Sequence, residues 1–512
     1  MLIKIKSITY SGLTPAEVDV EINIASRGMP SFDIVGLPNK AVEESKERVR
    51  TAIDNSGIQF PPKKITVNLA PGDVPKEGSF YDLPIAFGIL SSSQNIKIPN
   101  ESLFFGELSL DGTLRHTKGA LLMALFAKEN NYKNIFIPKA SANEASVLED
   151  VKVYGVESLS SLVNHFVSDD DLGQKMKPFT YKEQNEEPEN VEFDMSEVVG
   201  QKQAKRAVEI ASAGGHNIIM IGSPGAGKTM LARALPGILP NLNEEESLEV
   251  TKLYSVSGRT SPNSSLVKFR PFRSPHHTIS RVGLIGGGSK PKPGEISLAH
   301  NGILFLDEFN EFPRSILESL RQPMEDGFVT ISRSREQTDY PASFMLVASA
   351  NPCPCGYLNH PKKQCNCTPR QIENYKKRVS GPILDRIDLH VEVPNIDIEK
   401  LSNKNSSSEE SSKDIKRRIT KSRQIQEKRF SKDNIFLNAN MKNYHIKKYC
   451  PLDKKSEEIL IKASSRLNLS ARAYFKIIKI ARTIADLDSN EKINIKHIAE
   501  ALQYRPKSYR DN

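Results

Sequence analysis

Apolar and polar positions alternate through the first third of the chain in a way that predicts a mixed α/β domain. Short runs with strand-like alternation recur between longer stretches with helical apolar spacing, and turn residues lie at the joins. We therefore expect one domain over residues 1–167. Its predicted strands are residues 2–8, 16–24, 31–35, 64–69, 103–107 and 134–137, and its predicted helices are 39–56, 83–92 and 119–130.

Two polar stretches divide the rest of the chain. Residues 168–192 are acidic, with few apolar positions, and predict a linker. Residues 403–412 are rich in serine and predict a flexible loop. Strand and helix patterns alternate over residues 193–395, which predicts an α/β core, and residues 396–512 predict a helical domain. Its helices are expected at 454–467, 471–486 and 495–503.

A glycine-rich turn follows the apolar run 217–221 and precedes the helical stretch 230–235. This order is typical of a P-loop, in which backbone N–H groups and a helix start surround phosphate oxygens. Lys228 would reach the terminal phosphates, and Thr229 would present its hydroxyl to Mg²⁺. The eight residues of the turn are Gly222, Ser223, Pro224, Gly225, Ala226, Gly227, Lys228 and Thr229.

A second apolar run, residues 303–306, ends in Asp307 and Glu308. It has the form of a buried parallel strand with carboxylates at its C-terminal end. Asp307 would hold Mg²⁺ through water, and Glu308 would polarise the attacking water. Together with the P-loop, this pair of acids predicts a nucleoside triphosphatase.

Composition adds two limits. With 38% hydrophobic and 26% charged residues, and no run near the 18 or so apolar residues of a membrane span, the chain is expected to be a cytoplasmic protein without a membrane partner. The net charge of +9 permits a polyanionic partner without selecting one. The basic segment 413–432 predicts a helix whose charged face either is solvated or contacts nucleic acid.

Four of the five cysteines are clustered, which in such a chain favours metal over disulfides. Four thiolates can close a tetrahedral structural zinc site that orders the loop 353–367. The alternative is a set of free or redox-active thiols. Cys450 is expected to be an ordinary packed residue. The clustered residues are Cys353, Cys355, Cys365 and Cys367.

Further segments resemble the parts of AAA+ ATPases. Residues 198–201 resemble the segment that contacts the adenine base, and Asn351, which ends the apolar run 344–350, resembles the sensor 1 residue that orients the attacking water. Arg472 follows Ser470, a predicted helix cap, and matches the sensor 2 arginine, which contacts the γ-phosphate. The alternative for Arg472 is a surface arginine at a helix start.

The segment 380–388 resembles the helix end that carries the arginine finger, the residue that reaches into a neighbouring subunit's site. Arg386 is the predicted finger, and Arg378 is the second choice. The alternative for Arg386 is a surface ion pair with Asp385 or Asp388.

Several longer motifs narrow the resemblance to one family. They are residues 270–278 (RPFRSPHHT), 286–288 (GGG), 293–300 (PGEISLAH) and 351–356 (NPCPCG). With the motifs above, they are similar to the ComM/YifB family of magnesium-chelatase-like AAA+ ATPases over essentially the whole chain. The resemblance implies a Lon-protease-like α/β N-terminal domain, a three-layer αβα core with a parallel sheet and a C-terminal helical lid, with ATP and Mg²⁺ as substrate and cofactor.

The N-terminal domain carries its own resemblance, because residues 74–84 are similar to the nucleophile region of Lon-type proteases. The nucleophile position holds Phe80, and the lysine position holds Met123, so we expect a non-proteolytic domain. Ser79 and Lys118 lie close enough in the sequence to leave a peptidase open as an alternative.

Two glycine-rich or alternating segments could line the pore of a ring. They are the insert 270–295 and the hairpin 330–336, which carry Arg281, Lys290, Lys292, Arg333 and Arg335. Such residues suit a phosphate backbone, and the alternative is a surface hairpin without a ligand. His276 and His277 are expected to pack or to order their loop, with metal binding as the alternative.

The family resemblance implies a homo-hexameric ring that hydrolyses ATP between subunits. It also implies a DNA motor, a branch-migration helicase acting on incoming single-stranded or branched DNA in natural transformation. One alternative is a protein-remodelling chaperone or regulator that binds a protein partner through its N-terminal domain. The other is the motor subunit of a magnesium chelatase.

Overall fold

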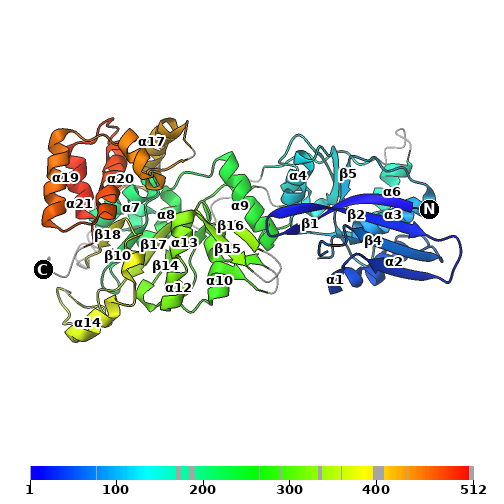
Figure 1. Cartoon of the computed structure of the whole chain (residues 1–512), viewed down its shortest axis with the longest axis horizontal. Coiled ribbons are helices and arrows are strands. Elements are labelled where there is room, and N and C mark those ends of the chain that lie inside the picture. The colour runs from blue at the N-terminus through cyan, green and yellow to red at the C-terminus, as the bar shows by residue number, and fades with distance from the viewer. Residues whose placement is uncertain are drawn as a thin grey trace. The chain divides into compact units, whose positions relative to one another are not determined.

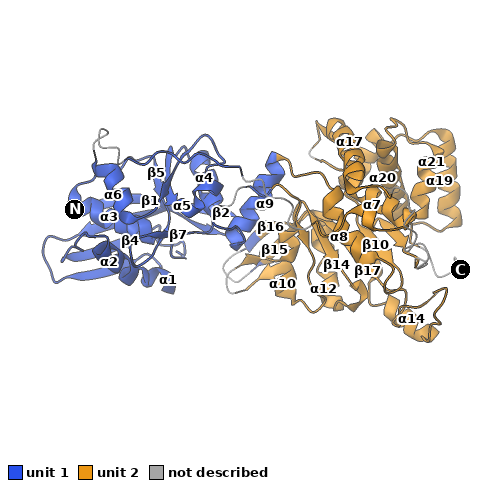
Figure 2. Cartoon of the chain, turned by 180° about the vertical axis from the view of Figure 1, so that it is seen from behind, with its two compact units in different colours: residues 1–185, 244–267, 332–338 blue, residues 186–243, 268–331, 339–512 orange. Residues whose placement is uncertain are grey.

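The chain folds into two compact units (Figures 1 and 2). The computed structural model describes residues 2–76, 78–168, 175–183, 191–263, 266–288, 291–332, 337–358, 360–395, 409–433 and 435–506. Unit 1 comprises residues 1–185, 244–267 and 332–338, and unit 2 comprises residues 186–243, 268–331 and 339–512. Lys290, Arg333, Arg335, most of the acidic linker and most of the serine-rich stretch lie outside the described residues.

Unit 1 is built on a mixed sheet of seven strands in the order β3-β4-β2-β1-β5-β8-β9. The long hairpin β1–β2 is antiparallel, with Leu2 opposite Asn23 and Ser11 opposite Thr14. Alternate positions of β2 are buried, as the period of two in its sequence predicts. The strands are β1 (Leu2–Ser11), β2 (Thr14–Ile24), β3 (Ser31–Val35), β4 (Lys64–Ala70), β5 (Ser102–Phe104), β8 (Asn134–Pro138) and β9 (Lys152–Val156), with a small hairpin of β6 (Glu107–Leu108) and β7 (Leu114–Arg115).

All six strands predicted for this region are present, and the predicted helix 39–56 is divided at Glu44 into two. Sequence reasoning missed β9, α5 and α6, because each is too short for its apolar spacing to stand out. Both α3 and α4 pack on the sheet. The helices of this region are α1 (Lys40–Glu43), α2 (Ser45–Asn55), α3 (Asp82–Gln94), α4 (Ala120–Glu129), α5 (Lys139–Ala145) and α6 (Leu159–Val167).

One helix of unit 1 comes from far along the chain. Helix α9 (Glu244–Ser257) follows the P-loop helix in sequence, yet it packs on α4. The hydroxyl of Ser255 accepts a hydrogen bond from the backbone N–H of Gly119 at 3.0 Å. The nearby carboxyl of Glu144 is buried, and burial raises its pKa although Ser255 is among its hydrogen-bond partners. The excursion 244–267 is therefore an integral part of unit 1.

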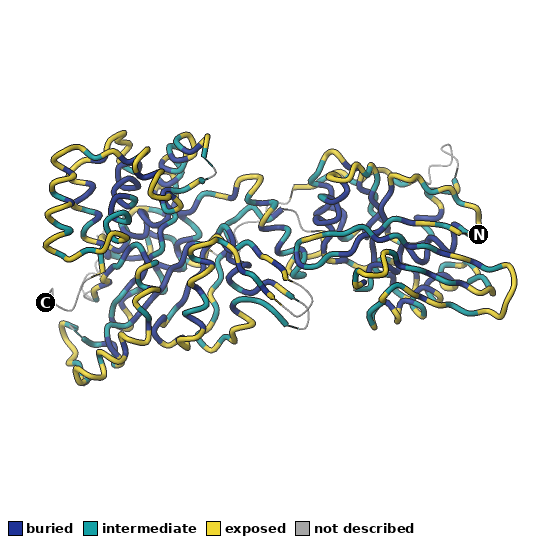
Figure 3. Tube along the Cα trace, viewed as in Figure 1, coloured by how far each residue is buried: buried dark blue, intermediate teal, exposed yellow. Residues whose placement is uncertain are grey.

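Unit 2 contains a sheet of five strands in the order β11-β14-β17-β10-β18, and every neighbouring pair is parallel. The three inner strands β14, β17 and β10 are almost wholly buried, as apolar runs covered on both faces must be, whereas the edge strands β11 and β18 are only partly buried (Figure 3). They are β10 (Ile218–Ile221), β11 (Phe272–Arg273), β14 (Ile303–Leu306), β17 (Met345–Ala350) and β18 (Leu389–Glu392). This is the parallel α/β core that the sequence predicts.

Helices surround this sheet, and a helical region follows it along the chain (orange to red in Figure 1). Within the described part of the chain, none of the helices combines the length and apolar character needed to cross a bilayer. The three C-terminal helices lie within one residue of their predicted ends. The helices around the sheet are α7 (Lys202–Gly214), α8 (Lys228–Ile238), α10 (Arg281–Ile285), α11 (Glu295–Leu298), α12 (Arg314–Glu318), α13 (Arg321–Asp326), α14 (Pro369–Lys376) and α15 (Gly381–Leu384), and those that follow are α17 (Ser412–Phe430), α18 (Asn443–Tyr449), α19 (Lys454–Arg466), α20 (Ala471–Leu487) and α21 (Ile495–Gln503).

The start of the core sheet is fastened to the C-terminal helices through Asp388. Its Oδ2 accepts a hydrogen bond from the backbone N–H of Asn217 at 3.2 Å, and its Oδ1 lies 3.4 Å from Nζ of Lys476 in α20. Burial alone would raise the pKa of Asp388, but Lys476, His216 and Lys479 hold that pKa well below its usual range. Burial in turn lowers the pKa of Lys476. Each partner therefore depends on the other for its charge.

We expect Asp388→Asn to lower the free energy of unfolding of unit 2 by about 3 kcal/mol at pH 7, because Lys476 would keep a buried charge without its partner. In calorimetry, this loss corresponds to a decrease in Tm of about 6 to 12 °C. Since the folded pKa of Asp388 is depressed, its stabilisation is present above the unfolded pKa of about 3.9 and is lost as the pH falls below that value. The Tm difference should therefore shrink below about pH 4. The exposed neighbour provides the control, Asp385→Asn, and a wild-type Tm for Asp388→Asn at pH 7 would contradict the assignment.

Candidate nucleotide-binding site

The P-loop and the acidic strand meet at the carboxyl edge of the core sheet. The loop starts where β10 ends, and the backbone N–H of Gly222 donates to the carbonyl of Ala350 at the end of β17. The ammonium of Lys228 donates to the carbonyl oxygens of Gly222 at 2.6 Å and Ser223 at 2.9 Å, and to Oδ1 of Asn351 at 3.3 Å. The structure thus brings together Lys228, at the start of α8, and Asn351, which follows β17.

The P-loop has room for phosphate oxygens. Gly225 and Gly227 have φ angles of +78° and +89°, and a Cβ atom built on either glycine would meet nothing within 4 Å. Left-handed φ values favour glycine at both positions, and the space beside each glycine is open. The structure therefore fits a polyphosphate here.

Thr229 and Asp307 form the part of the site that suits Mg²⁺. The Thr229 hydroxyl donates to Oδ2 of Asp307 at 2.9 Å, and the buried hydroxyl of Ser349 donates to the other carboxylate oxygen. Mg²⁺ prefers oxygen ligands of this kind and keeps several waters. Ser349 therefore orients Asp307, so that a hydroxyl and a carboxylate oxygen converge where Mg²⁺ would bind.

Glu308 lies beside this group in an uncommon backbone conformation, with φ of +53°. Burial lowers the pKa of the Lys228 ammonium, while the nearby charges of Asp307 and Glu308 oppose that shift. Oε2 of Glu308 lies 3.4 Å from Nδ1 of His277. The carboxylate is thus near Lys228 and in contact with a residue of the 270–278 motif.

The segment 198–201 also reaches the P-loop. The side-chain amide of Gln201 donates to the carbonyl of Ala226 at 3.1 Å and to that of Pro394 at 2.5 Å. Gln201 therefore connects the P-loop to the segment that follows β18.

Arg386 and Arg472 lie together, bound to one carboxylate. Arg386 forms an ion pair with Glu325 of α13, and Arg472 at the start of α20 lies 3.0 Å from the same Oε1 atom. Arg386, and then Arg472, hold the pKa of Glu325 below its usual value. The ion pair of Arg386 is therefore with Glu325, whereas the sequence alternative had Asp385 or Asp388.

These two arginines occupy the edge of the sheet opposite to the P-loop. Arg386 precedes β18, and its carbonyl accepts a hydrogen bond from the side chain of Asn217, which precedes β10. The P-loop follows the other end of β10. At about 3.3 Å per residue, the five residues from 217 to 222 separate the two edges by about 16 Å. Arg378 lies elsewhere, with its side chain 2.7 Å from Oε2 of Glu311.

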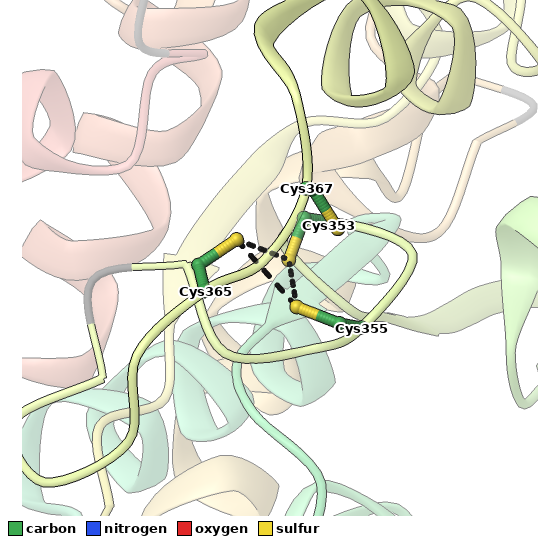
Figure 4. Close-up of side chains that lie close together, drawn as sticks. All are labelled: Cys353, Cys355, Cys365 and Cys367. Atoms are coloured by element: carbon green, nitrogen blue, oxygen red, sulfur yellow. Dashed lines mark hydrogen bonds between the residues drawn. The ribbon is translucent and has the colours of Figure 1, made fainter.

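The four clustered cysteines converge in the loop after β17 (Figure 4). Their sulfur atoms all lie within 4.8 Å of one another, and the closest pairs are 3.4 to 3.7 Å apart. A tetrahedral zinc ion with bonds of about 2.3 Å places sulfur atoms about 3.8 Å apart. A hydrogen bond from the backbone of Tyr357 lowers the pKa of Cys355 to about 6, whereas, against an opposing backbone hydrogen bond from Cys367, burial and the hydrogen bonds with Cys355 and Cys353 raise the pKa of Cys365 to about 12. The cluster therefore fits a metal ion, whereas Cys450 lies apart and buried.

The same loop touches the P-loop. Gly356 has a φ of +81°, and a Cβ atom added to it would lie 2.6 Å from Cδ of Pro224 and 3.9 Å from Cγ of Asn351. The cysteine loop therefore packs against Pro224 of the P-loop and lies near Asn351, the residue that contacts Lys228.

The two segments expected to line a pore are packed against each other. The insert forms α10 and a small hairpin of β12 (Gly286–Gly287) and β13 (Lys292–Pro293), and the second segment forms β15 (Phe328–Ser332) and β16 (Gln337–Pro341). A Cβ on Gly286 would lie 2.8 Å from Cδ1 of Ile331, and the hydroxyl of Tyr340 donates to the carbonyl of Pro291 at 2.8 Å. Arg281, at the start of α10, and Lys292, in β13, are exposed.

The exposed face of helix α17 carries less positive charge than its sequence indicates. Arg418 lies 2.6 Å from Glu209 and 2.7 Å from Glu410, and Arg429 forms an ion pair with buried Asp486. Arg423 donates to the carbonyl of Ser212 at 2.6 Å. These arginines hold α17 against the core and the neighbouring helices. Much of the positive charge of α17 is therefore used in contacts within the protein and does not face solvent.

In unit 1, the position compared with a protease nucleophile is part of an aromatic cluster. The ring of Phe80 lies 4.4 Å from that of Phe105 and 4.7 Å from that of Tyr81, and Met123 is buried. The hydroxyl of Ser79 donates to Glu107. Ser79 thus has a carboxylate as its partner.

Sequence reasoning did not identify Glu325, Ser349 or the contact of His277 with Glu308. A polar residue in the apolar run 344–350 was a signal for Ser349. Glu325 carried no signal, because its role depends on two arginines that are distant in the sequence.

Sequence comparison relates the chain to known proteins. Residues 20–141, 194–401 and 409–505 match the family models described as subunit ChlI of Mg-chelatase, magnesium chelatase subunit ChlI, and its C-terminal region. Competence protein ComM of Haemophilus influenzae is 42% identical over 509 residues, which cover 98% of this chain and 97% of that protein.

YifB of Escherichia coli, itself uncharacterised, is 41% identical over 96% of this chain and 95% of its own length. The 38 kDa magnesium-chelatase subunit of Cereibacter sphaeroides is 26% identical over 176 residues, which are 31% of this chain and 53% of that subunit. Similarity to the two former proteins thus extends over all parts of the chain, and similarity to the chelatase subunit over about a third.

Proposed function

The chain belongs to the ComM/YifB family of magnesium-chelatase-like AAA+ ATPases, and from this premise we propose that it is an ATP-hydrolysing ring motor that acts on DNA. The observation that carries the proposal is the separation of the P-loop from Arg386 and Arg472, at opposite edges of one sheet. A subunit of this shape cannot complete its own site. Two subunits placed edge to edge can, and repetition of that contact closes a ring, for which we propose six subunits.

In the proposed reaction, the P-loop amides and Lys228 hold the phosphates of ATP, while Thr229 and Asp307 hold Mg²⁺. Mg²⁺ supplies positive charge that stabilises the transferring phosphoryl group. Glu308 accepts a proton from the attacking water, and Asn351 orients that water. Arg386 and Arg472 enter from the neighbouring subunit and stabilise the developing charge.

The surface proposed for DNA is formed by α10, the hairpin β12–β13 and the hairpin β15–β16. Arg281 and Lys292 give it positive charge, which attracts a phosphate backbone. The match with a protein named for competence supports incoming single-stranded or branched DNA as the substrate, and branch migration during natural transformation as the process. Such a motor would work in the cytoplasm.

For unit 1 we propose a Lon-protease-like domain without proteolysis, which docks a protein partner or supports ring assembly. The aromatic packing of Phe80 and the pairing of Ser79 with Glu107 support this proposal, because neither provides the lysine that a Ser-Lys nucleophile requires.

For the cysteine loop we propose a structural zinc ion held by all four thiolates. The positions of the four sulfur atoms support this proposal. Because Gly356 of the same loop packs against Pro224, the zinc ion would also order the P-loop.

Mixing inactive variants tests which arginines act between subunits. Lys228→Ala and Arg386→Ala should each be inactive, whereas an equimolar mixture should regain up to about a quarter of wild-type ATP turnover, because random assembly joins the two intact halves at about that share of interfaces. Lys228→Ala with Arg472→Ala should recover in the same way. The control pair, Arg386→Ala with Arg472→Ala, should stay inactive because both losses fall on the same side of each interface. Recovery in that control would place Arg472 in its own subunit's site.

Single-stranded DNA should stimulate ATP turnover, and the apparent affinity should fall as salt rises. The double variant Arg281→Ala/Lys292→Ala should weaken DNA binding and reduce the slope of log affinity against log salt by about 1.4, since each contact with a single strand contributes about 0.7. A charge-matched control on the outer face of α17, Lys421→Ala/Lys428→Ala, should keep the affinity within about twofold. ATP turnover that is indifferent to DNA would favour protein remodelling instead.

Elemental analysis of the purified chain should find one zinc ion per subunit. Cys365→Ser should lose that zinc and lower the rate of ATP hydrolysis, because the loop against Pro224 would lose its order. Cys450→Ala, which removes a thiol outside the cluster, should retain the metal. A full complement of free thiols without metal in the wild-type chain would instead favour the redox alternative.

A further inference from the structure

The positive charge of the chain is concentrated in its C-terminal region. Residues 409–505 contain 23 lysines and arginines and 12 aspartates and glutamates, whose net charge of +11 exceeds the +9 of the whole chain. The remainder of the chain is therefore slightly acidic. Since Arg418, Arg423 and Arg429 of α17 are bound within the protein, the charge available to a ligand comes from lysines. The segment 434–452 carries three of them and no acidic residue.

Helix α18 in this segment presents one face to solvent. Positions i, i+3 and i+4 of that face are Tyr444, Lys447 and Lys448, and all three are exposed. Tyr444 is 60% exposed, and its ring centroid lies 3.8 Å from that of buried His445. Nδ1 of His445 accepts a hydrogen bond from the backbone N–H of Lys442 at 3.0 Å. The exposed tyrosine is therefore held against a fixed ring, with two lysines on the same helix face.

A second exposed ring, that of Phe436, lies eight residues earlier. Phe436 is 61% exposed, although both of its neighbours are anchored. Ile435 packs against the hydrophobic core of unit 2, and a Cβ atom added to Gly215 would lie 2.6 Å from Cδ1 of Leu437. The turn η4 (Asn438–Asn440), which follows, and α18 both pack on α20. Eight residues span at most about 29 Å, so a strand of several nucleotides can contact both rings.

Two lysines of this segment are available to a ligand. Lys442 and Lys447 are exposed, and neither forms an ion pair with any residue that the structure describes. Lys448 is instead 3.1 Å from Oδ2 of Asp433. Two cations and two exposed rings are thus left facing solvent. An unpaired nucleotide offers the matching groups, because its base has a π-face and its phosphate is an anion.

We define the α18 surface as Phe436, Lys442, Tyr444 and Lys447, and we propose that it is a second binding site for DNA, specific for single strands. Unpaired bases stack on the two rings, and the lysines contact phosphates. Bases in a duplex are stacked on one another and leave no face for a protein ring, whereas an acidic peptide needs only the lysines. This site shares no element with the surface of α10 and the two hairpins, and it rests on the proposed function only in taking DNA as its ligand.

Binding of a fluorescent oligothymidylate to the full-length protein tests the α18 surface. Tyr444→Ala should weaken binding at least about fivefold and leave the slope of log affinity against log salt unchanged, because a stacking contact is lost and no phosphate contact. Tyr444→Phe keeps the ring and should retain the wild-type affinity within about twofold. Lys442→Ala/Lys447→Ala should instead reduce the slope by about 1.4.

The matched control is Lys462→Ala/Arg466→Ala, which removes two exposed cations from α19, a helix without aromatic residues, and should keep the affinity within about twofold. Thermal unfolding is measured in parallel, and Tyr444→Ala should keep the wild-type Tm because its side chain is exposed. Wild-type affinity in Tyr444→Ala, or an equal loss in Tyr444→Phe, would overturn the proposal. So would tighter binding of polyglutamate than of oligothymidylate, which would make an acidic protein the better ligand.

These measurements separate the inference from the proposed function. If oligothymidylate binding depends on Tyr444 while ATP turnover ignores DNA, the motor proposal fails and the α18 surface stands. If DNA stimulates turnover and Tyr444→Ala binds and responds as wild type does, the motor proposal stands and the α18 surface fails. A wild-type protein that binds no oligothymidylate would overturn both.

Discussion

The parallel direction of the five core strands is the constraint on which the site depends. All carboxyl ends lie at one edge, so the loops after β10, β14 and β17 bring Lys228, Asp307 and Asn351 within reach of one another. The same rule places whatever precedes a strand at the other edge, and Arg386 precedes β18. The P-loop group and Arg386 therefore lie at opposite edges of the same sheet.

Each edge of the sheet is held by a contact with another part of unit 2. At the carboxyl edge, the cysteine loop rests on Pro224 through a glycine that leaves no space between them. At the opposite edge, Asp388 and Lys476 bind the start of the sheet to α20, the helix that carries Arg472. Because the arginines and the sheet share this attachment, a movement of the C-terminal helices changes the arginine edge directly.

The residues that sequence reasoning located are those whose chemistry follows a strand within a few positions. Gly222 to Thr229 and the Asp307–Glu308 pair are such local patterns, and the structure gathers them. Glu325 and the partner of His277 could not be located in this way, because each contact joins segments that only the fold brings together. The basic character of α17 was visible, but the sequence could not show that Arg418 and Arg429 are used in ion pairs with Glu209 and Asp486. Helix α9 (Glu244–Ser257) was not predicted from the sequence, and neither was the unit that it joins, because its contact with α4 links segments that are distant along the chain.

That last feature affects how the protein could change in evolution. Helix α9 buries Val250 and Leu253 in unit 1, although it is encoded between two parts of the core. The loss of residues 1–185 alone would expose these side chains to water. Residues 244–267 would then form a loop without a packing partner, joined at its base by the hydrogen bond from the backbone N–H of Leu242 to the carbonyl of Lys268. A gene could shed the first unit only by deleting a second segment at the same time. We therefore expect the two units to be retained or lost together. Related proteins that lack the first unit should also lack the segment that corresponds to residues 244–267.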